Sequence, residues 1–318
     1  MKGLKVNYMI KRAVAIGIFA SLVVLLGCDI EEFSDSNRVK EDFHYTYDFK
    51  AGGRLSIDNF NGSIEITGWD QNKIDISGTK YASTQENLSI LKIDIVNSPD
   101  SVQIRTVRPT DRRGSMGARY YIKLPHQAQL ERIISSNGSI KVDSIEGFTR
   151  LRTSNGAVRA SVVKGDLEAR TTNGSIEAEN VEGRVEFQTS NGAIRARDIR
   201  GSFEAGTTNG SIRAALAKPE PNRPVKLHTS NGSVELTMDA VAGNDITAST
   251  SNGGITLHRP SALDAELKAS TSNSTVHSDF EVKVSGTASK NHLEGAIGKG
   301  GSRIDLSTSN GGIKVLKM

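Results

Sequence analysis

The sequence predicts an all-β protein, a single-stranded β-solenoid (β-helix) in which each coil, or rung, takes about eighteen residues. An Asn-Gly phrase returns along the chain, usually after hydroxyl residues and before a small residue and Ile or Val. From Asn137 to Asn209 it recurs at every eighteenth position, and the next three steps are slightly longer. A turn signal at a fixed short period is typical of stacked repeat proteins. The repeat asparagines are Asn61, Asn137, Asn155, Asn173, Asn191, Asn209, Asn231, Asn252, Asn273 and Asn310.

Within each strict repeat, apolar residues alternate with mostly charged ones. Counted from the Asn, the third, fifth and eighth residues are apolar and the tenth is glycine. In the rung after Asn173 these are Ile176, Ala178, Val181 and Gly183. Such alternation, interrupted by glycine, predicts two short strands per rung. Large inward residues pair with small ones, which predicts a narrow and filled interior, and we expect a right-handed coil.

Other repeat folds fit the sequence less well. A propeller blade needs about 40 residues and a leucine-rich repeat about 20–29 residues with many leucines. The left-handed hexapeptide helix of many acyltransferases places an aliphatic residue at every sixth position, whereas the inward positions here are unevenly spaced. The calcium-binding nonapeptide requires an aspartate after its glycines, and the Asn-Gly turns have none.

Residues 1–27 are expected to be a lipoprotein signal peptide. Four basic residues precede a mostly apolar run from Ala13 to Leu26, which is too short to span a bilayer and fits a secretory signal. The run ends in Leu-Leu-Gly before Cys28, the single cysteine of the chain. This resembles the lipobox of bacterial lipoproteins, so Cys28 is the expected site of acylation. Asp29 resembles the retention signal of enteric lipoproteins and favours the periplasmic face of the inner membrane.

Signal removal changes the charge balance. It takes four basic and no acidic residues from the 40 Lys+Arg and leaves 36 to balance the 36 Asp+Glu. A neutral mature chain offers no general reason to expect nucleic-acid binding. A local basic loop could still contact an anionic envelope surface, although a solvated loop is the plainer interpretation. The expected contact region consists of Trp69, Arg108, Arg112, Arg113 and Arg119.

The mature chain divides into three parts. Residues 28–42 are expected to form a polar tether, residues 43–132 an irregular β region that contains a hairpin, and residues 133–318 the regular solenoid. A proline-rich insertion at 219–224 explains the longer step after Asn209, and the long gap before Asn310 suggests a degenerate rung around Asn291. No segment after residue 28 is expected to be helical.

The Asn-Gly pairs are expected to form a structural ladder of turns. Both residues tolerate left-handed backbone angles, and Asn amides stacked about 4.8 Å apart can bond to one another. The alternative is that the hydroxyl rows, such as Thr171 and Thr172, face a ligand such as ice or a glycan. Charges stacked on neighbouring rungs, such as Arg159 and Glu177, are expected to help set register by up to about 1 kcal/mol. The regular part of the ladder consists of Asn137, Gly138, Asn155, Gly156, Asn173, Gly174, Asn191, Gly192, Asn209 and Gly210.

Several motifs resemble the bacterial putative-adhesin family of β-solenoid domains. Residues 52–66, followed by Gly-Trp-Asp at 68–70, resemble the opening of that family. Residues 121–125 with the following Ser-Asn-Gly repeats resemble its middle, and residues 308–313 its closing strand. The resemblance implies a secreted or membrane-anchored solenoid without catalytic residues, often a lipoprotein or linked to envelope stress. One departure is Asn273, which is followed by serine instead of glycine.

We therefore expect a non-catalytic binding or structural module of the cell envelope, with an unidentified envelope protein or glycan as partner. No cofactor or metal is expected, because His228, His258 and His277 fall at different positions of their rungs. The alternative is a β-helix enzyme that cleaves polysaccharides. Such enzymes need clustered carboxylates and sugar-stacking aromatics, whereas the chain has no Trp or Tyr from Asn137 onward.

Overall fold

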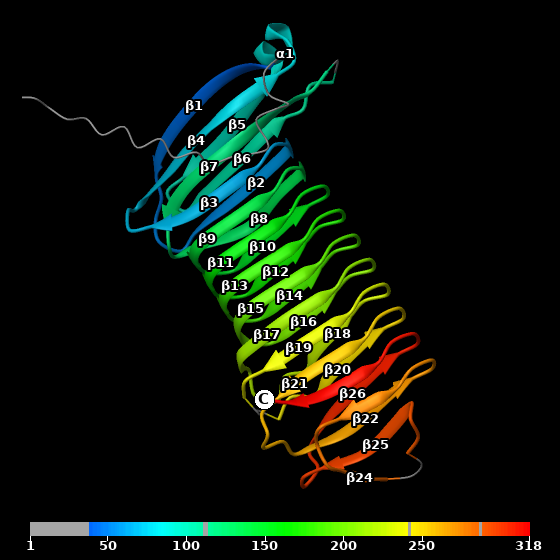
Figure 1. Ribbon diagram of the computed structural model, residues 1–318. Coiled ribbons are helices and arrows are strands. Elements are labelled where there is room, and N and C mark those ends of the chain that lie inside the picture. The colour runs from blue at the N-terminus through cyan, green and yellow to red at the C-terminus, as the bar shows by residue number, and fades with distance from the viewer. Residues whose placement is uncertain (1–37, 111–113, 241–242, 286–287) are drawn as a thin grey trace, which may run out of the picture. The chain divides into compact units, whose positions relative to one another are not determined.

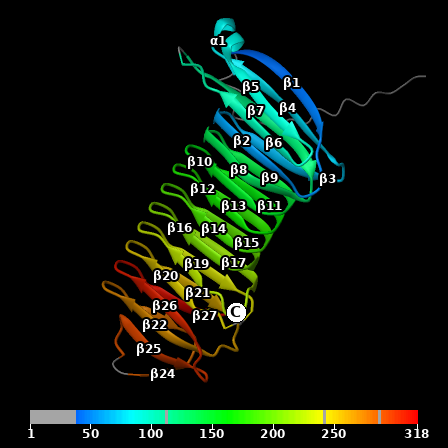
Figure 2. The same cartoon turned by 180° about the vertical axis from the view of Figure 1, so that it is seen from behind.

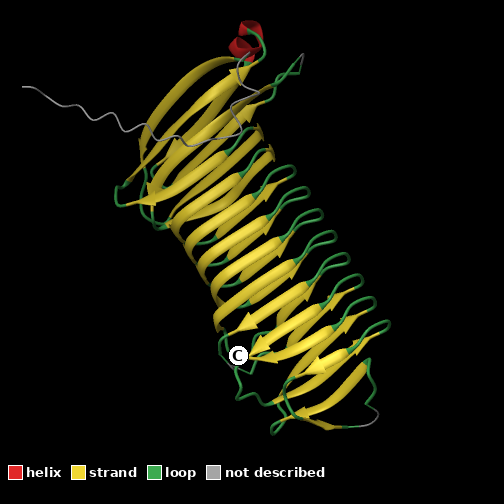
Figure 3. Ribbon diagram, in the orientation of Figure 1, coloured by secondary structure: helices red, strands yellow, loops and turns green. Residues whose placement is uncertain are grey.

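Each repeat forms a rung of two strands, and the stacked rungs build two long sheets that face each other (Figure 1, Figure 3). The computed structural model describes residues 38–110, 114–240, 243–285 and 288–318, which belong to the unit Arg38–Met318. The expected all-β solenoid is confirmed.

In the described part of the chain the two sheets hold 27 strands between them. The first sheet runs in the order β1 (Val39–Asp48), β4 (Lys73–Ala82), β7 (Met116–Pro125), β3 (Ile64–Trp69), β9 (Ile140–Glu146), β11 (Val158–Lys164), β13 (Ile176–Glu182), β15 (Ile194–Gly201), β17 (Ile212–Pro219), β19 (Val234–Met238), β21 (Ile255–Arg259), β27 (Ile313–Lys317) and β23 (Val276–Ser278). The second sheet runs β24 (Val282–Val284), β25 (His292–Ile297), β22 (Ala265–Thr271), β26 (Ser302–Thr308), β20 (Ile246–Thr250), β18 (Val225–His228), β16 (Phe203–Gly206), β14 (Val185–Gln188), β12 (Leu167–Arg170), β10 (Thr149–Thr153), β8 (Ala128–Asn137), β2 (Gly53–Asn61), β6 (Ser101–Val107) and β5 (Lys92–Ser98).

The core lies between the sheets and is built by the alternation within each strand. Ile176 and Ala178 of β13 are buried, and the intervening Glu177 faces outward. Neighbouring rungs pair in parallel with equivalent repeat positions side by side, so Ile176 lies beside Ile194. Burial of one such aliphatic side chain is worth roughly 1.5–3 kcal/mol. Identical inward residues thus stack along the axis, and the register is fixed wherever a slip would expose them.

A stacked bulge explains the uneven spacing of the inward residues. The seventh residue after each of the four repeat asparagines from Asn137 to Asn191 has a left-handed backbone angle, with φ between 50° and 60°. This extra outward residue shifts the next buried residue from the seventh position to the eighth. The four bulge residues are Ser144, Val162, Asn180 and Asp198.

One of these bulge residues is strained, which leads to a prediction. Val162 is β-branched, has φ 51° and is 45% exposed, so its side chain adds little packing while its backbone is unfavourable. We expect Val162→Asn to raise the free energy of unfolding by about 1 kcal/mol. Thermal unfolding followed by circular dichroism measures this. Val163→Asn is the matched control and should destabilise, because Val163 is buried; a fall in stability with Val162→Asn would contradict the strain.

The later rungs depart from this pattern. The bulge is absent from β17, β19 and β21, where Leu216, Met238 and Arg259 occupy the seventh position and are buried. Burial lowers the pKa of the Arg259 guanidinium to about 10, and Arg259 donates to the Ala240 carbonyl at 3.1 Å. The longer step after Asn209 lies between β17 and β18, where the proline-rich insertion was expected.

The C-terminal rung lies out of sequence order. Strands β26 and β27 insert between the rung of β20–β21 and the rung that contains β22 and β23 (Figure 2). The degenerate rung expected around Asn291 is therefore wrong. Asn291 lies in the turn before β25, which pairs antiparallel with β22 at the end of the stack. A chain that turns back in this way covers the last parallel rung and limits edge-to-edge association.

The N-terminal region differs from the sequence-based expectation in two places. Residues Gln85–Ile90 form helix α1, begun by Thr84, whose hydroxyl accepts a hydrogen bond from the Asn87 amide at 3.2 Å. The expectation of no helix was wrong. The helix has only six residues, too few to show an amphipathic pattern, and its one sequence signal is the capping residue Thr84. Strand β1 begins at Val39, inside the expected tether, because Val39 packs against a small cluster of buried residues that includes Leu88. Within the described residues no helix is long and apolar enough to cross a membrane.

Candidate functional site

The repeat asparagines form a continuous ladder on the edge of the solenoid. From Asn155 onward, each Asn side-chain amide donates to the side-chain oxygen of the Asn one rung nearer the N-terminal end, at 2.7–2.8 Å. The Asn310 side chain lies between those of Asn252 and Asn273, as the strand order requires. Because these amides hydrogen-bond to one another, their geometry is that of a structural element. The ladder joins Asn137, Asn155, Asn173, Asn191, Asn209, Asn231, Asn252, Asn310 and Asn273.

The glycines of the Asn-Gly pairs are required for a different reason than expected. Among the described residues, no Asn or Gly of the regular ladder has a positive φ, so the expectation of left-handed turns at these positions is wrong. A Cβ on Gly174 would lie 2.5 Å from the carbonyl carbon of Gly156 on the neighbouring rung. Glycine is needed because the backbones of successive rungs approach too closely for a side chain.

The two hydroxyl rows before the ladder have different environments. The first row is buried, and each hydroxyl donates to a glycine carbonyl of the neighbouring rung, as Thr171 does to Gly156 at 3.0 Å. The second row, which includes Thr172 and Thr208, is largely exposed. The first row therefore holds adjacent rungs together and does not face a ligand.

The expected contact region is not a single surface. In the pairing of β3 with β7, Trp69 lies opposite Pro125, whereas Arg119 precedes Tyr120, the partner of Ile64 at the other end of the strand. Arg119 lies over the ring of Tyr81 and Arg108 over the ring of Phe60. Arg112, Arg113 and Cys28 lie outside the described residues.

The histidines of the later rungs are not brought together. His228 lies on β18 of the second sheet, and His258 and His277 lie on β21 and β23 of the first sheet with β27 between them. His228 contacts the Ser249 hydroxyl at 2.8 Å, and His277 contacts Asp279 at 3.0 Å. Within the described residues no group of three or more metal-ligating side chains occurs.

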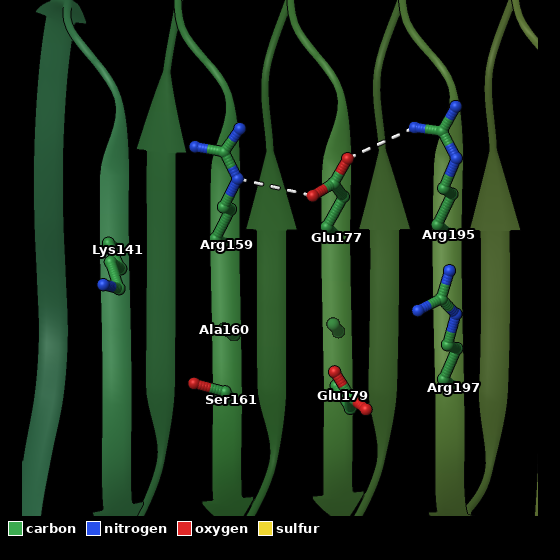
Figure 4. A pocket seen from close by; sticks show the side chains of 9 residues that line it. Lys141, Arg159, Ala160, Ser161, Glu177, Glu179, Arg195 and Arg197 are labelled. Atoms are coloured by element: carbon green, nitrogen blue, oxygen red, sulfur yellow. Dashed lines mark hydrogen bonds and ion pairs between the residues drawn. The ribbon is translucent and has the colours of Figure 1, made fainter. Parts of the chain in front are cut away.

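A shallow trough of about 410 Å³ crosses the outer face of the first sheet over β9, β11, β13 and β15 (Figure 4). Outward side chains at the fourth position of each rung form one wall, and those at the sixth position form the other. Between them lie the alanines of the fifth position, of which Ala160 and Ala178 are 4% and 5% exposed. The walls are Lys141, Arg159, Glu177 and Arg195 on one side and Ser161, Glu179 and Arg197 on the other.

Ion pairs leave cations in excess in this trough. Glu177 accepts hydrogen bonds from Arg159 at 3.3 Å and from Arg195 at 3.2 Å. Lys141 and Arg197 form no ion pair with the described residues. The lining thus carries four cations and two carboxylates. Sequence reasoning found these charge stacks but assigned them only a role in register, because it did not consider the space that an inward residue leaves between two outward rows.

A second hollow of about 320 Å³ lies on the outer face of the second sheet. Glu186 and Glu204 come from adjacent strands there, and Lys226 follows at the same position of the next rung. Glu186 is paired with Arg170 at 2.6 Å and with Arg184 at 3.3 Å. Gly206 has open space where a side chain would project, so this hollow exists because one side chain is missing from an outward row.

The fold and these outward faces define a repeat protein whose side chains are presented on two flat, polar sheets. A family model described as Toastrack DUF4097 matches residues 53–316. This chain belongs to the Toastrack DUF4097 family, and the resemblance to adhesin-like solenoids is confirmed. No curated protein matches the chain.

The solved structures that are similar to this chain include the following three. One, described as a putative cell adhesion protein from Clostridium sporogenes, has 12% identity and a TM-score of 0.21 over 87% of this chain and 100% of its own. Another, described as a putative lipid binding protein from Parabacteroides distasonis, has 14% identity and a TM-score of 0.41 over 89% and 98%. A third, described as a putative adhesin from Bacteroides fragilis, has 13% identity and a TM-score of 0.30 over 87% and 97%.

Proposed function

We propose that this protein is a lipoprotein of the cell envelope, anchored by acyl chains on Cys28, and that its solenoid is a non-catalytic binding module. The observation that carries the anchor is the N-terminal sequence, in which basic residues, a mostly apolar run at 13–26 and Leu-Leu-Gly lead directly to Cys28. Strand β1 begins at Val39, and the intervening chain reaches at most roughly 40 Å when extended. The solenoid would therefore work close to a membrane surface, with the inner membrane favoured by Asp29.

The side faces of the solenoid support a role in binding. The outward rows of both sheets are charged and polar over many successive rungs, as in the pairs Arg150–Glu168 at 2.8 Å and Arg213–Glu235 at 2.8 Å. Such exposed pairs contribute at most about 1 kcal/mol each to stability. A regular array of this kind suits extended recognition of a partner along the axis, which is how other stacked-repeat proteins use their surfaces.

Replacing the anchor tests the first part of the proposal. We expect the protein to fractionate with membranes and to be released only by detergent, and Cys28→Ala to abolish this association because Cys28 is the single cysteine of the chain. Two membrane-bound acyl chains give stable anchoring. Ser34→Ala, in the same tether, is the matched control and should stay membrane-bound. A native protein that fractionates without membranes would contradict the lipoprotein assignment.

The alternative, an enzyme that cleaves polysaccharide, would place its chemistry in the second hollow, where Glu204 lies opposite Lys226. A carboxylate and a cation on adjacent strands could serve as acid and base. If the native protein shortens a glycan and Glu204→Gln abolishes the cleavage, the binding module must be given up in favour of the enzyme.

A further inference from the structure

We propose that the trough on the first sheet binds an acidic polysaccharide that carries both carboxylates and hydroxyls, lying along the stack of rungs. This inference rests on the proposed binding function and names the class of ligand. It starts from the geometry of the trough. Adjacent strands are about 4.8 Å apart, so the strands β9 to β15 present a strip of roughly 14 Å between their outer members.

The floor of the trough allows a polymer to lie close to the sheet. This floor is the strand backbone at the fifth position of each rung, where the side chains of Ala160 and Ala178 point inward to the core. The outward side chains of the fourth and sixth positions stand on either side of this strip of backbone, which leaves space between the two walls (Figure 4). A chain of sugar rings could therefore contact both walls at once along successive rungs.

The charges of the trough favour a carboxylate ligand. Lys141 and Arg197 have no ion-pair partner among the described residues, so binding of an anion to them breaks no existing pair. Arginine binds a carboxylate through two parallel N–H donors, and the resulting charge-assisted hydrogen bonds are stronger than hydrogen bonds between neutral groups. Arg159 and Arg195 share the single carboxylate of Glu177, which leaves guanidinium donors of both available.

The hydrogen-bond acceptors in the trough narrow the class of ligand further. The carboxylates of Glu177 and Glu179 are acceptors only, and they would repel a ligand that offers only phosphate oxygens. Ser161 donates its hydroxyl proton to Asp143, so its oxygen is also left as an acceptor. A ligand with hydroxyl donors beside its carboxylates satisfies this mixed lining. Single-stranded nucleic acid is disfavoured because the residues that line the trough include no aromatic on which bases could stack.

Binding of the full-length, detergent-extracted protein to polygalacturonate tests the inference. We expect measurable binding that weakens with added salt, and no binding to neutral dextran. The double variant Lys141→Ala/Arg197→Ala should bind about tenfold more weakly, as expected for the loss of two charged contacts. The matched control is Arg152→Ala/Lys314→Ala, which also removes one lysine and one arginine from exposed positions and should bind like the native protein.

Each other outcome would overturn the inference. No binding to polygalacturonate, equal weakening in both double variants, or tighter binding to polyphosphate or single-stranded DNA would each do so. A midpoint of thermal unfolding equal to that of the native protein shows that each variant is folded. The experiment separates this inference from the anchor, because glycan binding in detergent does not depend on acylation of Cys28. Shortening of the polygalacturonate would instead refute the non-catalytic function itself.

Discussion

Gly174→Ala is expected to lower the free energy of unfolding by about 4 kcal/mol, a loss at the upper end of the range for single substitutions. The added Cβ would lie 2.5 Å from the carbonyl carbon of Gly156, and this neighbour is backbone that cannot move without displacing a rung. The side chains of Asn155 and Asn173, which share a hydrogen bond of 2.8 Å, would be separated by the same displacement.

A second glycine provides the control for this prediction. Gly206 has no atom within 4 Å of its added Cβ and does not have a positive φ. Gly206→Ala should therefore be neutral or stabilise by up to about 1 kcal/mol. Chemical unfolding of the two variants measures the difference. Similar stabilities for Gly174→Ala and Gly206→Ala would show that the rungs do not approach as closely as described.

Removal of residues 302–318 is expected to destabilise the C-terminal end of the solenoid strongly. It deletes β26 and β27, whose four most buried aliphatic side chains contribute roughly 6–12 kcal/mol together. Those residues are Ile304, Leu306, Ile313 and Val315. Strands β22 and β23 lose their parallel partners, so we expect the segment 265–297 to lose protection in hydrogen exchange.

The effect should stay local, because each rung contacts only its neighbours. The rungs from Asn137 to Asn191 should keep the exchange rates of the intact chain. Removal of Met318 alone, which is 52% exposed and donates one backbone hydrogen bond to Arg259, should leave the segment 265–297 protected. If 265–297 stays protected, its strands have stacked directly on β20 and β21 in sequence order. That result would contradict the inserted C-terminal rung.

The regular rungs could be predicted from the sequence because their pattern is local. The alternation around Ile176 and the constant step between successive repeat asparagines define both the strands and the register. The order of the last rungs could not be predicted, since the phrases at Asn252 and Asn310 are alike and nothing local shows which of them the departing phrase at Asn273 stacks on. The turn-back depends on the antiparallel pairing of β22 with β25, which no local signal specifies.

The candidate site was predictable in its charges but not in its shape. The stack of Arg159, Glu177 and Arg195 is visible in the sequence. Recognition of a trough also required the structure, which shows how the outward side chains of the fourth and sixth positions lie on either side of the inward fifth residues. The distance between Trp69 and Arg119 could not be predicted from the sequence either, because it depends on the pairing of β3 with β7, which places them at opposite ends of the strand pair.

The lipoprotein assignment is the foundation of the proposed function, and the mass of the protein purified from its native membranes decides it. We expect a mature chain that begins at Cys28 and is heavier than unmodified residues 28–318 by the mass of its acyl chains. A chain that still carries residues 1–27, or one with a free Cys28 thiol, would contradict the anchored binding module.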